Sequence, residues 1–336
     1  MQLVIIAGGL GTRLRPLTLH RPKALLPLVD RPQIVHILDA LPPSCDEVIV
    51  AVNFMFDQVR DFFRMRQLGV EVRVVEEKAP LGTGGAIKNV QRHIRGPFAV
   101  YNGDVVDTID FDRLVEAHEK GGGIGTIALW PVEDVSAYGI VAIERGRITK
   151  FVEKPPKGEA PSNLANAGRY VFEPTVFDFI ETGRPVSLER EVFPALMGRG
   201  LTPYRYEGFW SDAGTLPSYL HAQRLLLDAG RAKIAPDADV GAAQLLPPVY
   251  VGPGCFAEGR VGPHVVLGRT CRVGRASLTN AALYEGVSID DKAEIAGSII
   301  GSGAAVGEGA HVRDSILADG VQVPPHATIV DERVSA

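Results

Sequence analysis

The first two thirds of the chain alternate short apolar runs with longer stretches of helical periodicity. The apolar runs are compact and rich in β-branched residues, which is typical of strands covered on both faces. They lie at residues 3–6, 47–52, 70–75, 98–101 and 124–129. Helical patterns lie between them at residues 34–41, 56–66 and 111–118. This alternation predicts βαβ units, and therefore an α/β domain around a mostly parallel sheet.

From about residue 137 the pattern changes to paired strands. Residues 140–144 and 148–152 are joined by Arg145-Gly146-Arg147, which is a hairpin signal. The sheet is therefore predicted to be mixed. A last helix over residues 216–228 is followed by Gly230, a typical stop just beyond a helix C-terminus.

From residue 247 onward, small aliphatic residues recur every six positions. Glycine often follows the aliphatic position, as at Gly262 and Gly268, where a flat face turns a corner and a side chain would be crowded. This repeat predicts a parallel, left-handed β-helix of about five coils over residues 247–336. The alternative is a loop-rich domain of scattered strands. Residues 1–228 then form the first domain and residues 229–246 a connector. The aliphatic positions of the repeat are Val261, Leu267, Val273, Ile289, Ile295, Ile300, Val306, Val312, Leu317, Val323 and Ile329.

Composition narrows the class of protein. A chain of 336 residues with 46% hydrophobic and 22% charged residues is long enough for two domains with separate cores. Its formal net charge of -5 gives no basic footprint for nucleic acid or an anionic membrane. The three cysteines form no CxxC pair, which favours the cytoplasm. The N-terminal apolar run lacks the length and basic flank of a membrane span or signal peptide.

The segment after the first strand has the composition of a phosphate-binding loop. It reads Ala7-Gly8-Gly9-Leu10-Gly11-Thr12-Arg13, and Arg15 follows. Glycines let the backbone approach an oligophosphate and aim N–H groups at its oxygens, while arginines add charge-assisted donors. A P-loop is excluded because no GxxxxGK[ST] occurs, and a dinucleotide fingerprint fails because Leu14 stands at the third glycine position. The sequence therefore predicts a triphosphate cradle.

A candidate metal ligand follows the apolar run at residues 98–101. Asp104 would lie at the carboxyl end of that strand, where open α/β sheets bind ligands. Mg²⁺ prefers oxygen ligands, commonly one or two carboxylates together with phosphates. An aspartate after glycine is also a common turn residue, so Asp104 needs a second carboxylate to support the metal hypothesis.

The motifs together resemble one family. AGGLGTRLRPLT followed by RPKALLPLVDRP is similar to the signature of sugar nucleotidylyltransferases, which include mannose-1-phosphate guanylyltransferase and glucose-1-phosphate thymidylyl-, uridylyl- and adenylyltransferases. Further motifs follow in the family's order: PLGTGGA from Pro80, NGD from Asn102, FVEKP from Phe151, NAG from Asn166 and FWSD from Phe209. The resemblance implies a Rossmann-like nucleotidyltransferase domain, to which a hexapeptide domain is a common appendage.

The same resemblance implies the chemistry and the roles of individual residues. A sugar 1-phosphate attacks the α-phosphorus of a nucleoside triphosphate in line, so catalysis is positioning and charge neutralisation. Arg13 and Lys23 are the implied catalytic cations, and Asp212 joins Asp104 as an implied Mg²⁺ ligand. The implied nucleotide site consists of Ala7, Gly8, Gly9, Gly11, Thr12, Arg13, Glu77, Pro80, Gly82, Thr83, Asn102 and Gly103. The implied sugar-phosphate site consists of Gly139, Glu153, Lys154 and Asn166.

The motifs look most like those of the mannose-1-phosphate guanylyltransferase branch, and this resemblance favours GTP and mannose 1-phosphate as substrates. A carboxylate such as Glu77 can accept from both the N1–H and the amino group of guanine. The alternatives are thymidylyl or uridylyl transfer to glucose 1-phosphate, a non-catalytic sugar-nucleotide sensor, and acyl transfer in the β-helix with His264, His311 or His326 as base. Every phosphate, metal or sugar motif precedes residue 229, so the coils are expected to form a homo-oligomer through an exposed apolar face.

Overall fold

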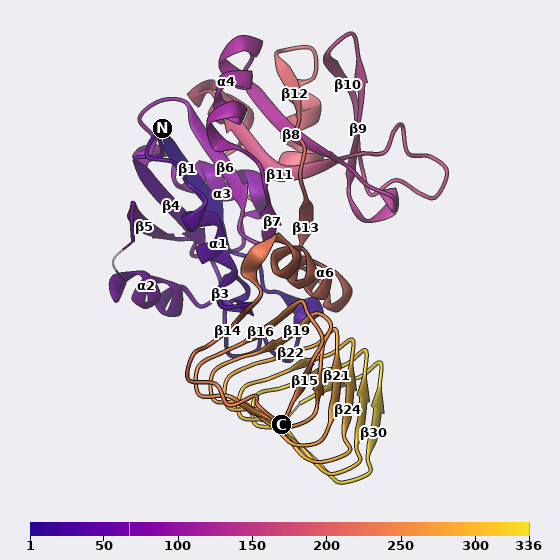
Figure 1. Ribbon diagram of the computed structural model, residues 1–336. Helices are drawn as coiled ribbons and strands as arrows, with labels where there is room; N and C mark the ends of the chain where they lie inside the picture. The colour runs from indigo at the N-terminus through magenta and orange to yellow at the C-terminus, as the bar shows by residue number, and fades with distance from the viewer. Residues whose placement is uncertain (67, 336) are drawn as a thin grey trace. The chain divides into compact units, whose positions relative to one another are not determined.

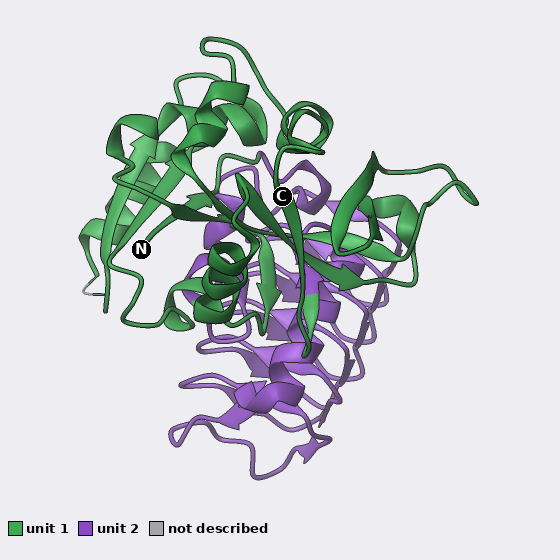
Figure 2. Ribbon diagram, turned by 90° about the horizontal axis from the view of Figure 1, so that it is seen from above, with its two compact units in different colours: residues 1–9, 36–210 green, residues 10–35, 211–336 purple. Residues whose placement is uncertain are grey.

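The computed structural model describes residues 1–66 and 68–335, which divide into two compact units (Figures 1 and 2). The first unit comprises residues 1–9 and 36–210. The second comprises residues 10–35 together with the C-terminal part from residue 211. This division does not follow the chain order, because a segment near the N-terminus packs with the C-terminal coils. No helix in the described part of the chain is both long and apolar enough to cross a bilayer.

A mixed sheet of nine described strands forms the centre of the first unit. Its order is β10-β9-β11-β6-β1-β4-β5, and β8 pairs with both β11 and β12. Strands β6, β1, β4 and β5 run parallel, whereas β11 is antiparallel to β6, β8 and β9. The predicted mixed α/β sheet is thus confirmed. The strands are β1 (Gln2–Ile6), β4 (Glu47–Val52), β5 (Glu71–Glu76), β6 (Phe98–Asn102), β8 (Gly125–Pro131), β9 (Gly139–Glu144), β10 (Arg147–Glu153), β11 (Leu164–Phe172) and β12 (Leu201–Arg205).

Helices cover this sheet, and the central strands are buried on both faces. Leu3, Val4 and Ile5 are successive residues of β1 with no exposed surface, which explains why that strand is a continuous apolar run rather than an alternating one. The helices are α1 (Gln33–Asp39), α2 (Phe56–Arg64), α3 (Gly82–Asn89), α4 (Phe111–Gly121) and α5 (Phe193–Leu196). The short strand β7 (Val105–Asp107) follows β6, and β13 (Trp210–Asp212) crosses from the first unit to the second.

The hairpin between β9 and β10 forms as expected. Glu144 pairs with Arg147, so Arg145 and Gly146 make a two-residue turn. Both have positive φ, 50° and 75°. This is the conformation that type I′ hairpin turns require, and glycine adopts it without steric cost.

The second unit contains a parallel β-helix, as the hexapeptide repeat predicted. Its faces are three parallel sheets of seven, six and five described strands. The seven-stranded face consists of β14 (Lys233–Ile234), β16 (Val249–Val251), β19 (Val265–Leu267), β22 (Ala282–Leu283), β25 (Ile299–Ile300), β28 (Ile316–Leu317) and β31 (Arg333–Val334). The six-stranded face consists of β15 (Gln244–Leu245), β18 (Arg260–Val261), β21 (Ser277–Thr279), β24 (Glu294–Ala296), β27 (His311–Arg313) and β30 (Thr328–Val330). The five-stranded face consists of β17 (Phe256–Ala257), β20 (Arg272–Val273), β23 (Ser288–Ile289), β26 (Ala305–Val306) and β29 (Gln322–Val323).

Glycine at the corners is explained by the neighbouring coil. A Cβ added to Gly268 would lie 2.8 Å from the carbonyl carbon of Tyr284, and one added to Gly301 would lie 2.5 Å from that of Ala318. Real Cβ atoms do not approach backbone so closely, so only glycine lets successive coils stack there. The segment 229–246, expected as a connector, contributes β14 and β15 to the coils.

The apolar outer side of the seven-stranded face is covered within the same unit. Val266, Ile299 and Ile316 point away from the helix interior yet are 4%, 0% and 0% exposed. Helix α6 (Leu216–Leu226) lies across this face (Figure 1), and Gln223 Nε2 donates to the carbonyls of His264 and Ala281, both at 3.1 Å. The expectation of an exposed apolar face is therefore wrong, because the chain's own helix covers it. The segment 10–35 adds β2 (Pro27–Leu28) and β3 (Arg31–Pro32) to this unit.

Candidate functional site

The carboxyl ends of four parallel strands gather the first group of predicted residues. Beyond the ends of β1, β5 and β6, backbone pairing continues: Ala7 N donates to Ala51 O at 2.9 Å, Glu77 N to Val52 O at 2.7 Å and Gly103 N to Ile6 O at 2.9 Å. These bonds align Ala7, Glu77 and Gly103 along one edge of the sheet in the first unit. This edge is where open α/β sheets bind ligands.

Glu77 is buried at this edge, beside Gly8. Glu77 is only 4% exposed, and its Oε1 has no hydrogen-bond partner among the described residues. A Cβ added to Gly8 would lie 3.1 Å from Oε1, so the glycine leaves room for the carboxyl group. Burial raises the pKa of Glu77 to about 7, against the opposing effect of a backbone hydrogen bond from Leu81. The site therefore holds a carboxyl group that changes charge near neutral pH.

A buried arginine braces the turn that carries Asp104. This turn connects β6 to β7, and Arg169 on β11 donates to the carbonyls of Asn102 and Val105 on its two sides, both at 2.8 Å. Arg169 Nε also lies 2.8 Å from Asp107 Oδ2, but no N–H points directly at that oxygen, so the contact is ionic rather than a directed hydrogen bond. The turn is thereby held at both ends.

A bulge in β11 contains Asn166 and places Gly168 against Asn102, just before the same turn. Pairing with β8 shifts register between Asn166 and Tyr170. Gly168 has a φ of +70°, and a Cβ there would lie 2.6 Å from Asn102 Nδ2. Asn166 Oδ1 accepts from Gly168 N at 3.1 Å, and its Nδ2 donates to the Tyr170 hydroxyl at 2.8 Å. Asn166 is thus fixed by its own bulge, with one amide hydrogen left for a ligand.

Two cations of the second unit converge on one backbone position. A Cβ added to Gly214 would lie 2.9 Å from Arg13 Nη2 and 3.4 Å from Lys23 Nζ. Lys23 is only 9% exposed, whereas Arg13 is exposed and makes no ion pair with any described residue. Two cations this close together create a positive potential that attracts anions. This cluster can therefore bind a polyanion such as phosphate.

The glycine-rich loop after β1 brings Arg13 to the position beside Gly214 through the conformation of Gly11. Its φ of +62° is left-handed, and a Cβ there would lie 2.8 Å from the Thr18 side chain and 3.1 Å from that of Lys23. Thr18 Oγ1 donates to Gly11 O at 2.9 Å and closes the loop. A short 3-10 turn, Thr12–Leu14, then places Arg13 outward and Leu14 inward. Gly9 and Thr12 are exposed, with nothing near the Cβ position of Gly9.

Asp212 lies two residues before Gly214. Its Oδ1 is buried and has no hydrogen-bond partner among the described residues. Thr215 then caps α6, accepting from Ser218 N at 3.3 Å. A buried carboxylate oxygen without a donor is costly unless a cation takes it. Within the described chain no cluster of three or more acidic, histidine or cysteine ligands occurs, so a metal here would need phosphate oxygens as well.

Gly139 and Glu153 lie against each other, as the sugar-site hypothesis requires. A Cβ added to Gly139 would lie 2.8 Å from Glu153 Oε2. Glu153 is half-buried, and burial raises its pKa, with nearby Glu189 adding to the rise and Lys154 and Arg190 opposing it. The carboxylate is therefore partly desolvated and close to a buried backbone position.

Lys154 has an unusual backbone conformation. Its φ is 49°, which is rare and strained for a residue with a side chain. Its N–H donates to Tyr138 O at 3.0 Å, which continues the β9–β10 pairing, and its side chain is exposed. The chain bends here, with Glu153 half-buried and the Lys154 side chain exposed to solvent.

The predicted base-reading segment packs against residues 185–191. Gly84 N donates to Val186 O at 2.8 Å, and a Cβ at Gly82 would lie 2.6 Å from the same oxygen. Thr83 Oγ1 donates to Glu189 at 2.8 Å and accepts from Leu188 N at 2.9 Å. The Thr83 hydroxyl is thus already engaged, whereas Pro80 is exposed. Glu189 was not predicted from the sequence, although it lies near Glu153 as well as Thr83.

Comparison with known proteins decides the family. The nucleotidyl transferase model matches residues 2–229, and the GMPPB C-terminal domain model matches residues 229–336. The chain belongs to the nucleotidyl transferase family. Mannose-1-phosphate guanylyltransferase 1 of Arabidopsis thaliana is 35% identical over 317 residues, 90% of this chain and 86% of that protein. The Drosophila melanogaster mannose-1-phosphate guanylyltransferase catalytic subunit beta is 38% identical over 277 residues, 80% of this chain and 71% of that protein.

Solved structures of this nucleotidyl transferase's relatives cover mainly the first domain. HddC from Yersinia pseudotuberculosis is 25% identical, with a TM-score of 0.58 over 67% of this chain and 99% of that one. A putative glucose-1-phosphate thymidylyltransferase from Bacillus anthracis is 26% identical, with a TM-score of 0.61 over 67% of this chain and 94% of that one. Membership of the family confirms an enzyme that joins a nucleotide to a sugar phosphate, as the sequence motifs indicated.

Proposed function

We propose that this nucleotidyl transferase transfers GMP from GTP to mannose 1-phosphate, releasing pyrophosphate. The observation that supports it most directly is the convergence of Arg13 and Lys23 beside Asp212, a polyanion site with a buried, unpartnered carboxylate oxygen. Relatives at 35–38% identity carry the name mannose-1-phosphate guanylyltransferase. Thymidylyl or uridylyl transfer to glucose 1-phosphate is the alternative outcome of the test below.

Arg13 and Lys23 are the proposed catalytic cations. The Arg13 guanidinium is a planar fork suited to the departing pyrophosphate, whereas the Lys23 ammonium is a point charge suited to the α-phosphate. The backbone of Ala7, Gly8, Gly9, Gly11 and Thr12 is proposed to donate to the triphosphate, together with Asn102 and Gly103. The positive groups stabilise charge that develops in the transition state, so no nucleophilic side chain is needed.

Glu77 is the proposed reader of the base. As a carboxylate it offers two oxygens to the N1–H and amino donors of guanine, which thymine and uracil lack as a pair. Its Oε1 lacks a partner among the described residues, so a bound base would satisfy it. We propose that Pro80 and Gly82 line the same base site and that Thr83 fixes its shape through Leu188 and Glu189.

The sugar phosphate is proposed to bind at Gly139, Glu153, Lys154 and Asn166. Glu153 accepts from sugar hydroxyls, the remaining amide hydrogen of Asn166 donates, and the exposed Lys154 ammonium pairs with the sugar's phosphate. The strained backbone of Lys154 favours this role, because strain of about 1–3 kcal/mol persists mostly where function requires it.

Nucleotidyl transferases of this kind use a divalent metal, and we propose Mg²⁺ with Asp104 and Asp212 as its protein ligands. The unpartnered Oδ1 of Asp212 fits a hard cation. Bound Mg²⁺ would neutralise charge on the triphosphate. Arg169 braces the backbone turn that carries Asp104, which supports this role.

The test is a pyrophosphate-release screen of five nucleoside triphosphates against mannose, glucose, N-acetylglucosamine and heptose 1-phosphates. GTP with mannose 1-phosphate is expected to give the highest kcat/KM, and a clear preference for another pair would refute the substrate assignment. Lys154→Ala should raise mainly the KM for sugar phosphate, whereas Arg13→Ala should impair use of the triphosphate or the rate constant. A Lys154→Ala variant altered only in triphosphate kinetics would show that the sugar site is misplaced.

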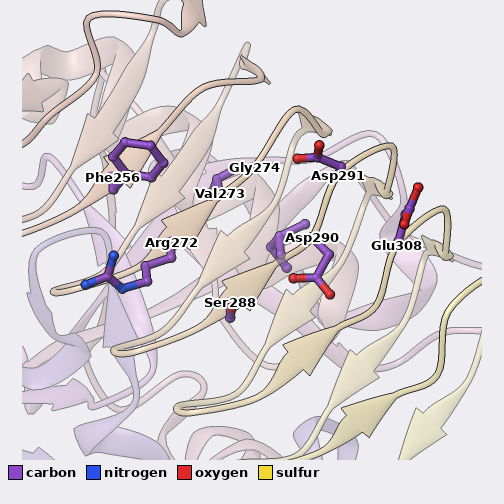
Figure 3. Close-up of a pocket in the computed structure, with 9 residues that line it drawn as sticks. Phe256, Arg272, Val273, Gly274, Ser288, Asp290, Asp291 and Glu308 are labelled. Carbon is purple, nitrogen blue, oxygen red and sulfur yellow. The ribbon is translucent and has the colours of Figure 1, made fainter.

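We also propose that the β-helix forms a homo-oligomer, through the five-stranded face. Phe256, Arg272 and Ser288 follow one another along successive strands of this face. A groove of 410 Å³ lies there. In Figure 3, Arg272 lies towards one end of the groove, and Asp290 lies between it and Glu308 at the other end. Arg272 and Asp290 are both exposed, and neither forms an ion pair with a described residue. A two-fold axis would pair Arg272 of each copy with Asp290 of the other.

Light scattering of charge variants tests this interface. Arg272→Glu should lower the molar mass in solution, and Arg272→Glu combined with Asp290→Arg should restore it. Arg260→Glu, on the six-stranded face, is the control and should leave the mass unchanged. A wild-type monomer, or an Arg272→Glu variant of unchanged mass, would rule the interface out. The cytoplasmic location remains a prediction, consistent with three free cysteines.

A further inference from the structure

A pocket of the first unit lies at the edge of its sheet opposite the carboxyl ends of the parallel strands. Backbone pairing aligns Leu201 with Gly125, Gly125 with Phe172 and Phe172 with Phe98 in one row across β12, β8, β11 and β6. This row marks the amino end of β6, four residues from Asn102 at the carboxyl end. At about 3.3 Å per residue the two edges are roughly 13 Å apart. The pocket beside this row measures 610 Å³, within the range of about 300–1,000 Å³ usual for small-molecule sites.

The lining of this pocket is basic and rich in glycine. Four of its eleven residues are glycines, and the described lining includes Arg147 and Arg199 but no acidic residue. Both arginines are exposed, and neither forms an ion pair with a described residue, Glu144 across the hairpin included. The Arg199 guanidinium stacks over the Phe179 ring at 5.7 Å, which orients it. Two positive charges without an ion-pair partner among the described residues, in one depression, attract anions.

A β-bulge adds polar groups to the same wall. Ile148 pairs with Ile143 and Lys150 with Ala142, so Thr149 is the extra residue without a ladder partner. Thr149 is exposed and lines the pocket. Bulges of this kind leave backbone groups unpaired and redirect a side chain, and they recur beside binding sites. Open space next to Gly122 and Gly198 would let a ligand approach the backbone closely.

We propose that this pocket binds a phosphate-bearing small molecule, independently of the polyanion site at Arg13 and Lys23. Arg147 and Arg199 supply paired charge-assisted donors, the Thr149 hydroxyl supplies a neutral donor, and the glycines supply backbone surface. The absence of acidic lining residues in the described pocket selects anions over zwitterions and cations. The ligand is recognised by its phosphate, which either a nucleotide or a sugar phosphate can carry.

Calorimetric titration with pyrophosphate tests the site without relying on activity. The wild-type chain is expected to bind two equivalents, Arg147→Ala/Arg199→Ala one, and Arg13→Ala one. The control Arg64→Ala/Arg66→Ala removes two exposed charges from α2 and its C-terminal flank and should still bind two. Arg147→Lys/Arg199→Lys keeps the positive charges but not the planar, bidentate guanidinium groups. This variant should retain the second site with affinity weakened by about tenfold. Circular dichroism checks that each variant is folded.

Parallel titrations with inorganic phosphate, a nucleoside monophosphate and a hexose 1-phosphate show which carrier binds. Binding that is lost in Arg147→Ala/Arg199→Ala but kept in the α2 control, in at least one titration, supports the proposal. Equal binding by wild type and Arg147→Ala/Arg199→Ala in all titrations overturns it, as does an equal loss in the α2 control. A wild-type chain that shows only the Arg147- and Arg199-dependent equivalent, and an Arg13→Ala variant that binds as wild type does, would instead count against the proposed catalytic site.

Discussion

Replacing Arg169 should destabilise the first unit and displace Asp104 at the same time. Arg169 is 1% exposed and is the only described side chain that bonds to both Asn102 and Val105 carbonyls. Its guanidinium also lies 4.3 Å from the centre of the Tyr101 ring. One buried side chain therefore holds both ends of the turn that contains Asp104.

The magnitude follows from what Arg169→Ala leaves behind. The Asp107 side chain, 5% exposed, would become an unpaired buried carboxylate, and two backbone carbonyls would lose their donors. Breaking a buried ion pair by removing one partner costs about 3–5 kcal/mol. Total stability is usually about 5–15 kcal/mol, so the variant should fold only marginally. Asp107→Asn keeps both carbonyl bonds and should cost less, about 1–3 kcal/mol.

Tryptophan fluorescence during urea unfolding measures the loss of stability in the first unit, to which Arg169 belongs. The two tryptophans, Trp130 and Trp210, both belong to the first unit, so their signal reports its unfolding. Arg113→Ala is the control, because its ion pair with Asp110 has side chains 76% and 53% exposed and should contribute less than about 1 kcal/mol. Equal unfolding midpoints for Arg169→Ala and Arg113→Ala would refute the bracing role.

Three further predictions concern the proposed chemistry. The pKa of Glu77, about 7, means that the carboxylate is mostly protonated at pH 6 and mostly ionised at pH 8, so KM for GTP should fall about tenfold over that interval in wild type and stay flat in Glu77→Gln. Asp104→Asn and Asp212→Asn should each fold but lose at least about a hundredfold in kcat at saturating Mg²⁺, and near-normal rates would exclude both as ligands. Truncation after residue 230 removes the coils against which residues 10–35 pack, so it should give an aggregating, inactive chain. A soluble, fully active product would contradict the division into two units.

The sequence was most informative where a side chain's surroundings are set by neighbours in the chain. The buried runs of β1 and β6, the hairpin at Arg145-Gly146 and the coil corners at glycine all follow from local periodicity and turn chemistry. The family motifs in turn pointed to Glu77 and Asp212, whose buried, unpartnered oxygens are visible only in the structure.

Contacts between residues far apart in the chain could not be predicted from local sequence patterns. Arg169 follows the Asn166-Ala167-Gly168 motif directly, yet nothing in its neighbourhood shows that it reaches Asn102, 67 positions earlier. The covering of Val266 and Ile299 by α6 was missed for the same reason, since periodicity shows that a face is apolar but not what covers it. Sequence reasoning therefore assigned to a second copy an apolar surface that the chain covers itself.

The coils also support the proposed phosphate site, because the basic loop is anchored to them. Arg21, two residues before Lys23, lies 3.1 Å from Asp319 and stacks over the Tyr284 ring at 5.7 Å. The Tyr219 hydroxyl on α6 donates to Pro27 O and lies 3.2 Å from the Tyr284 hydroxyl. The segment that presents Arg13 and Lys23 is thus held by side chains of the β-helix and α6. Since catalysis by positioning depends on such support, we expect the hexapeptide coils to contribute to nucleotidyl transfer although none of their residues touches a phosphate in the proposed reaction.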